Sequence, residues 1–181
     1  MRIVSLLPSA TEIVHALGLG DQLVGVSHEC GWPPEARAIP RVVSSALDPH
    51  LPSSEAIHHA VSQALARREA LYRLDVPRLA RLRPDLLITQ QLCQVCAVSS
   101  DDLPEAIRRL SPAPQILSLH PHHLADMLQD VLAVGRATDR HRQAHQLVDA
   151  LQARLARVRR RVAPPSQRPR GFGGEWFSPL M

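Results

Sequence analysis

The chain alternates short apolar runs with stretches of helical periodicity. Strands are predicted at 2–7, 23–27, 42–43, 86–89 and 115–119. Helices are predicted between them, at about 9–17, 53–65, 76–82, 101–110 and 122–134. This alternation favours an α/β fold, in which a parallel sheet is covered by helices on both faces of a single Rossmann-like lobe.

A long final helix is predicted over 139–163. Its apolar positions recur at steps of four and three, at Ala144, Val148, Leu151, Leu155, Val158 and Val162. Such a helix is on the order of 35 Å long. Because its apolar repeat covers fewer than four heptads, we expect it to pack along the lobe and not to form a coiled coil. We therefore expect a lobe over 1–138, a connector helix over 139–163, and the start of a second, truncated lobe over 164–181.

The positive charge of the chain is local. The net charge is +4, but seven of the 21 basic residues fall between 154 and 170, where there is no acid, and the remaining 14 face 17 acids. Aromatic residues make up only 3% of the chain. Because single-stranded nucleic acids need repeated aromatic platforms, we do not expect a nucleic-acid partner.

The N-terminal apolar run shows no signal sequence. Pro8 and Glu12 interrupt it early, and no run in the chain approaches the roughly 20 apolar residues of a membrane span. A cytoplasmic location without membrane insertion is expected on these grounds.

Two of the three cysteines follow the buried strand at 86–89. Cys93 and Cys96 can reach one metal ion, and His28 and Cys30 end another predicted strand. If these strand ends are neighbours, the four side chains form a nitrogen and sulfur set suited to zinc, to iron, or to the cobalt of a corrinoid. The alternative interpretation of the cysteines is small buried thiols that pack beside a loop.

Further candidates for ligand contacts lie near the carboxyl ends of predicted strands, where open parallel sheets bind ligands. Ser9 and Thr11 open the first helix, where Ser9 and Glu12 predict a capping box. Trp32 is a candidate apolar wall for a flat macrocycle or a residue that packs its loop onto the lobe, and Tyr72, expected at the end of a helix, is a candidate rim or packing residue. Glu29 is a candidate rim carboxylate, and the remaining ligand candidates are His28 and Gln91.

The segments 2–30, 71–75 and 83–98, with the strings RIVSLLPSATE, HEC and LCQVCAV, resemble a known family. They are similar to the cobalamin-binding branch of the helical-backbone periplasmic-type substrate-binding proteins of ABC transporters. The resemblance implies two α/β lobes joined by a rigid helix, with the ligand held between them. This chain departs from many members of that family at two positions. It has Gly31 where an acid is common, and Pro77 where a permease-docking glutamate is expected.

We therefore expect a substrate-binding module without enzymatic activity. Its expected ligand is a small metal-bearing molecule, most plausibly a cobalamin-type corrinoid. The alternative is a metal, iron–sulfur or redox protein that uses Cys30, Cys93 and Cys96. An ABC permease is a candidate partner, although the docking glutamate is absent. Because the second lobe would cover the connector helix, we also expect self-association through that helix.

Overall fold

The computed structural model describes residues 1–48, 50–67, 69–90, 103, 107, 110–162 and 170–171. Its main sheet has four parallel strands in the order β2-β1-β5-β6. These strands are Leu23–Val26, Ile3–Ser5, Leu86–Gln90 and Gln115–Leu119 respectively. The predicted parallel α/β fold is thus confirmed.

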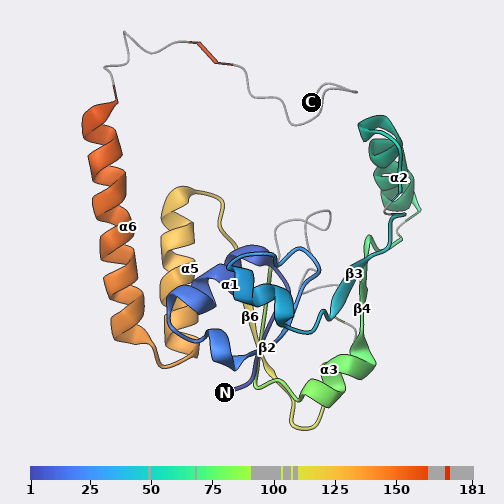
Figure 1. Cartoon of the computed structure of the whole chain (residues 1–181), viewed down its shortest axis with the longest axis horizontal. Helices are drawn as coiled ribbons and strands as arrows, with labels where there is room; N and C mark the ends of the chain where they lie inside the picture. The colour runs from blue at the N-terminus through green and yellow to red at the C-terminus, as the bar shows by residue number, and fades with distance from the viewer. Residues whose placement is uncertain are drawn as a thin grey trace.

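Helices pack on both sides of this sheet (Figure 1). On one side lie α1 (Pro8–Ala16), α5 (Leu124–Ala137) and α6 (His141–Arg161). The other side includes α3 (Val76–Leu82). Most of the helix predicted at 101–110 lies outside the described residues.

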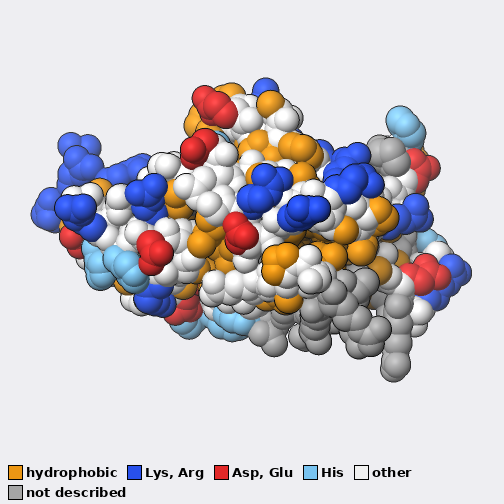
Figure 2. All heavy atoms as spheres, turned by 90° about the horizontal axis from the view of Figure 1, so that it is seen from below, with side chains coloured by type: hydrophobic (Ala, Val, Ile, Leu, Met, Phe, Trp, Pro, Cys, Tyr) orange, Lys and Arg blue, Asp and Glu red, His pale blue; other side chains and the backbone are white. Residues whose placement is uncertain are grey.

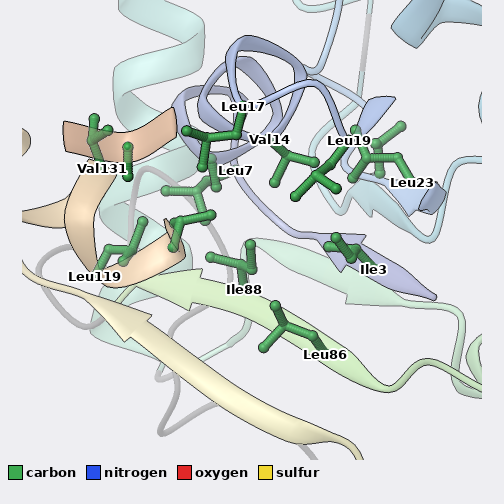
Figure 3. Close-up of a cluster of buried hydrophobic side chains, with 14 of the residues drawn as sticks. Ile3, Leu7, Val14, Leu17, Leu19, Leu23, Leu86, Ile88, Leu119 and Val131 are labelled. Carbon is green, nitrogen blue, oxygen red and sulfur yellow. The ribbon is translucent and has the colours of Figure 1, made fainter. Parts of the chain in front are cut away.

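The strand β5 shows how the sequence specifies this two-sided packing. Leu86 and Ile88 point into the cluster formed with α1 and α5, while Leu87 belongs to a second cluster on the opposite face. Figure 3 shows Leu86 and Ile88 on the same face as Ile3, directed toward Val14, Leu17 and Val131. All three β5 residues are fully buried, as a strand covered on both faces requires.

A small arm extends from the side of the lobe. The strand β3 (Val43–Ser45) pairs antiparallel with β4 (Tyr72–Leu74), and α2 (Ser54–Ala66) lies beyond them (Figure 1). The sequence predicted a strand at 42–43 but gave no strand at Tyr72, which was expected near a helix end. The reason is that β4 is half-covered and carries Arg73 between its two apolar residues, so it lacks the continuous apolar run of the buried strand β1.

The first helix begins differently from the prediction. It starts at Pro8, its N-cap is Leu7, and no side chain caps it, so the predicted capping box of Ser9 and Glu12 is wrong. Proline explains the shift, because its fixed φ and missing N–H suit the first position of a helix. Ser9 is consequently an exposed residue of the first turn.

Charged side chains are distributed unevenly over the surface. Figure 2, which views the molecule from below, shows arginine and histidine side chains gathered at the end that carries α6. Elsewhere on this face basic, acidic and apolar side chains are mixed. Within the described ranges, no helix is both long and apolar enough to cross a membrane.

The close packing of α5 on α6 depends on Gly135. A Cβ placed there would collide with Ala144 of α6 and lie 3.2 Å from the carbonyl oxygen of Arg140. Gly135→Val should therefore lower the free energy of unfolding by about 2–3 kcal/mol, as overpacking does. Chemical denaturation measures the loss. Gly31→Ala is the control, because its Cβ meets nothing within 4 Å, and equal stability of both variants would contradict this account.

Candidate ligand-binding edge of the sheet

The candidate site lies where β2 ends, and we call it the ligand edge: residues 27–32 together with Tyr72. The strand is specified by its apolar residues Leu23 and Val26, and the chain turns immediately after it, with the N–H of Cys30 donating to the carbonyl oxygen of Ser27 at 3.2 Å. This turn places His28 and Glu29 at the carboxyl edge of the parallel sheet. Ligands of open α/β sheets bind at this edge.

His28 is the central residue of the ligand edge. Its Nε2 lies 3.3 Å from Oε1 of Glu29, its Nδ1 lies 3.3 Å from Oγ of Ser27, and 24% of its side chain is exposed. Its ring lies 5.7 Å from the ring of Tyr72, centroid to centroid, at 47°. The arm thereby brings Tyr72 to His28 from a distant part of the sequence.

Trp32 completes the ligand edge with a large apolar surface. Its side chain is 62% exposed, more than any other large apolar side chain in the described residues. Glu29 is also exposed, at 67% of its side chain. The rings of His28 and Tyr72 lie beside one carboxylate, and the exposed Trp32 follows in the same segment, a combination of groups that suits a flat ligand with polar edges.

Arg41 holds the turn in place, and the sequence gave no indication of this role. Its Nη1 donates to the carbonyl oxygens of Ser27 and Cys30, at 2.9 and 2.8 Å. The segment containing Arg41 runs beside the end of β2, because Val42 donates its N–H to the carbonyl oxygen of Val26 at 2.9 Å. Only the tertiary structure shows that these two segments meet, so no local pattern could have indicated the contact.

Thr11 is a structural residue of the lobe interior. It is fully buried, and its Oγ1 lies 2.9 Å from Oγ of Ser5 and 3.1 Å from Sγ of Cys30. Its hydroxyl therefore supports the ligand edge from within and does not present a surface to a ligand. Ser9 lies elsewhere, on a groove between α1, α5 and α6.

Only His28 and Cys30 of the predicted metal set lie in the described residues, so the set of four with Cys93 and Cys96 stays a prediction. Cys30 is fully buried and points inward to Thr11, whereas His28 faces Tyr72. The strands that precede His28 and Cys93 are not neighbours, because β1 lies between them. Among the described residues, no three His, Cys, Asp or Glu side chains are grouped to hold a metal ion. The remaining predicted residues, Gln91, Cys93 and Cys96, lie outside the described residues.

Burial raises the pKa of the Cys30 thiol, and hydrogen bonds from Thr11 and the Ser27 backbone oppose this only in part. The neutral thiol thus contributes stability below the ordinary thiol pKa, and this contribution is lost as the pH rises through the folded-state pKa. Cys30→Ala should cost about 1–2 kcal/mol at neutral pH, less above about pH 9. Urea unfolding of the unaltered protein and of Cys30→Ala, from neutral pH to above about pH 9, measures the difference in stability. A difference that does not change with pH would contradict the raised pKa of the Cys30 thiol.

The chain belongs to the periplasmic binding protein family, whose model matches residues 3–176. The family agrees with the expectation of a binding module over an enzyme.

Individual relatives share this fold. The vitamin B12-binding protein of Pectobacterium atrosepticum is 29% identical over 157 residues, which are 80% of this chain and 48% of that protein. Among solved structures, the periplasmic vitamin B12-binding protein of Vibrio cholerae superposes with a TM-score of 0.60 at 22% identity, over 88% of this chain and 50% of that one. A periplasmic haem-binding protein of Roseiflexus gives 0.61 at 24% identity, over 91% and 52%. The chain thus spans about half the length of these relatives.

Proposed function

We propose that this lobe binds a flat, metal-bearing macrocycle of the cobalamin type at the ligand edge. The observation that carries the proposal is the pair of rings of His28 and Tyr72 beside the Glu29 carboxylate, where β2 ends, with the exposed Trp32 four residues after His28 in the sequence. Binding proteins named for vitamin B12 and for haem among the similar proteins support this ligand class.

The physical basis of recognition would be apolar contact with the face of the macrocycle and polar contact at its rim. A planar ring buries large area against aromatic side chains, which lose little conformational freedom on binding. Glu29 and the imidazole of His28 would meet the polar substituents at the ligand's rim. The turn is held by Arg41 before a ligand arrives, so little ordering is needed on binding.

Delivery of the ligand to an ABC permease belongs to the same proposal. Pro77 lies on α3 and is exposed, so this position offers no carboxylate to a permease. The adjacent Asp75 is already engaged, because its Oδ2 lies 3.3 Å from Nε of Arg78.

The alternative function, a metal or redox protein based on the cysteines, has no support in the described residues. Cys30 is buried, and its pKa is raised, whereas a reactive thiol needs a lowered pKa and access to solvent. The similar proteins named above are binders of vitamin B12 or haem.

Titration of the full chain with cyanocobalamin and, separately, with haemin tests the proposal. We expect saturable one-to-one binding of cyanocobalamin by calorimetry, with a dissociation constant on the order of micromolar, or about −8 kcal/mol. Binding of haemin alone would overturn the corrinoid assignment while leaving the macrocycle class intact. Binding of neither ligand would overturn the proposed function.

A further inference from the structure

A small polar pocket lies at the base of the arm, where β4 leads into α3 (Figure 1). Its lining includes three arginines, Arg41, Arg73 and Arg78, and one acid, Asp75. We call it the arginine pocket. Its volume of about 280 Å³ is just below the range of about 300–1,000 Å³ that is usual for drug-sized ligands, so it suits a small group.

Two of the three guanidinium groups are held in place by the fold. Nη1 of Arg41 donates to the carbonyl oxygens of Ser27 and Cys30, and among the described residues no hydrogen bond uses its Nε or Nη2. Nη1 of Arg78 donates to the carbonyl oxygen of Arg41 at 2.6 Å, and its Nε lies 3.3 Å from Oδ2 of Asp75. Because both side chains are ordered in advance, a ligand would lose little affinity to ordering them.

The third guanidinium, that of Arg73, is exposed on β4. No residue in the described part of the chain forms an ion pair or a hydrogen bond with its side chain. Arg73 pairs with Ser44 across the two strands of the arm, and both line the pocket. Since successive side chains of a strand point to opposite faces, Arg73 lies on the face of β4 opposite to Tyr72, which contacts His28. The arginine pocket is thus separate from the ligand edge.

The charge of the arginine pocket is not balanced by its own residues. Asp75 offsets one arginine, and its Oδ1 accepts the backbone N–H of Arg78 at 2.9 Å, so this carboxylate is fully used. Asp75 is the one acid in the lining, which leaves two positive charges. The wall behind them is dry, because Val42 and Val43 are 1% and 3% exposed, and water screens the charges less on that side.

We propose that the arginine pocket binds a phosphate group, either as inorganic phosphate or as part of a small phosphate monoester. A phosphate carries a charge of about −1.5 to −2 at neutral pH and three strong acceptor oxygens, which match two unbalanced arginines. The planar fork of arginine binds such oxygens in pairs. A single carboxylate has one charge and two oxygens, so it would leave one arginine unbalanced.

Calorimetric titration of the full chain with inorganic phosphate tests this proposal. We expect saturable binding with a dissociation constant on the order of 0.1 to 1 mM. Sulfate should compete with phosphate, because it is also a tetrahedral dianion, and acetate should not. Absence of saturable binding up to about 10 mM phosphate, or acetate binding as tight as that of phosphate, would overturn the proposal.

The source of the phosphate group follows from a parallel titration with glycerol 3-phosphate. Tighter binding of the ester would identify a small phosphorylated molecule as the ligand, and tighter binding of inorganic phosphate would identify the free ion. Both results support a phosphate site. Saturation by neither compound would overturn it.

Arg73→Gln should weaken phosphate binding by about tenfold or more, the loss of a hydrogen bond between charged groups. The side chain is exposed, so the variant should fold as the unaltered chain does. Arg73→Lys keeps the charge without the planar fork and should show an intermediate loss. Arg81→Gln is the matched control, because Arg81 is exposed on α3 and does not line the pocket. Equal losses for Arg73→Gln and Arg81→Gln would overturn the proposal.

The site does not rest on the proposed corrinoid ligand, and one measurement separates the two. Arg73→Gln should bind cyanocobalamin as tightly as the unaltered chain, since Arg73 and Tyr72 lie on opposite faces of β4. Phosphate should also shift the amide signals of 42–44 and 75–76 in NMR spectra. Loss of cyanocobalamin binding in Arg73→Gln, or phosphate shifts confined to other segments, would contradict a separate phosphate site.

Discussion

Trp32→Ala should lower the affinity for cyanocobalamin by about thirtyfold or more, because tryptophan is enriched among the hot-spot residues of binding surfaces. Trp32 is 62% exposed in the free lobe, so its loss removes little internal packing. Calorimetric titration measures the affinity, and thermal unfolding should show a melting temperature close to that of the unaltered chain.

Two further variants test whether the loss of affinity comes from the ligand edge. Trp32→Phe keeps an aromatic face and should retain much of the affinity, whereas Met127→Ala removes a 50% exposed apolar side chain from the groove between α1, α5 and α6 and should have no effect on ligand binding. If Trp32→Ala binds as tightly as the unaltered chain, the ligand edge is not the binding surface.

Leu87→Ala is expected to destabilise the lobe by about 3–5 kcal/mol, a large share of the stability of a domain of this size. Leu87 lies on β5, one of the two inner strands of the sheet, and its side chain is fully buried in the cluster opposite α1 and α5. Removing three of its carbons leaves a cavity that the paired strand cannot collapse to fill. Urea unfolding followed by circular dichroism gives the loss directly.

The matched control is Leu65→Ala on α2. Its side chain is 42% exposed, so the same chemical change should cost less than about 1 kcal/mol. Comparable losses for the two variants would mean that β5 is not the centre of the packed core.

The fold was predictable because the main sheet is built from local patterns. The apolar runs at 2–7, 23–27, 86–89 and 115–119 each contain one strand, and the long helix predicted over 139–163 is α6, His141–Arg161. Strands buried in a parallel sheet are largely apolar, so β1, β2 and β5 give a strong signal although they are short, whereas β6 is an edge strand with two exposed residues. By contrast, β4 is half-covered, and its pairing with β3 follows from tertiary contact.

The candidate site was predictable in part. The position of His28 and Glu29 at a strand end followed from the order of elements, and the exposure of Trp32 suits the wall that its sequence position suggested. The grouping of His28 with Cys93 presupposed adjacent strands, and the strand order is a long-range property that a local pattern does not encode. The same is true of Arg41, whose contacts to the turn span 14 and 11 residues.

The sequence also could not show whether a candidate side chain points into the lobe or toward solvent. Thr11 and Cys30 are 19 residues apart and meet inside the lobe, so two candidate contact residues became part of its interior. Their polar atoms bond to each other, which satisfies the hydroxyl without solvent.

The central claim is that a corrinoid binds at the ligand edge, and amide chemical-shift mapping by NMR during titration with cyanocobalamin tests it most directly. The account predicts saturable shifts at 27–32 and 71–74, with the amides of 124–131 and 151–155 unmoved under conditions that hold the chain monomeric. Shifts confined to the groove between α5 and α6, or no shifts at saturating ligand, would contradict it.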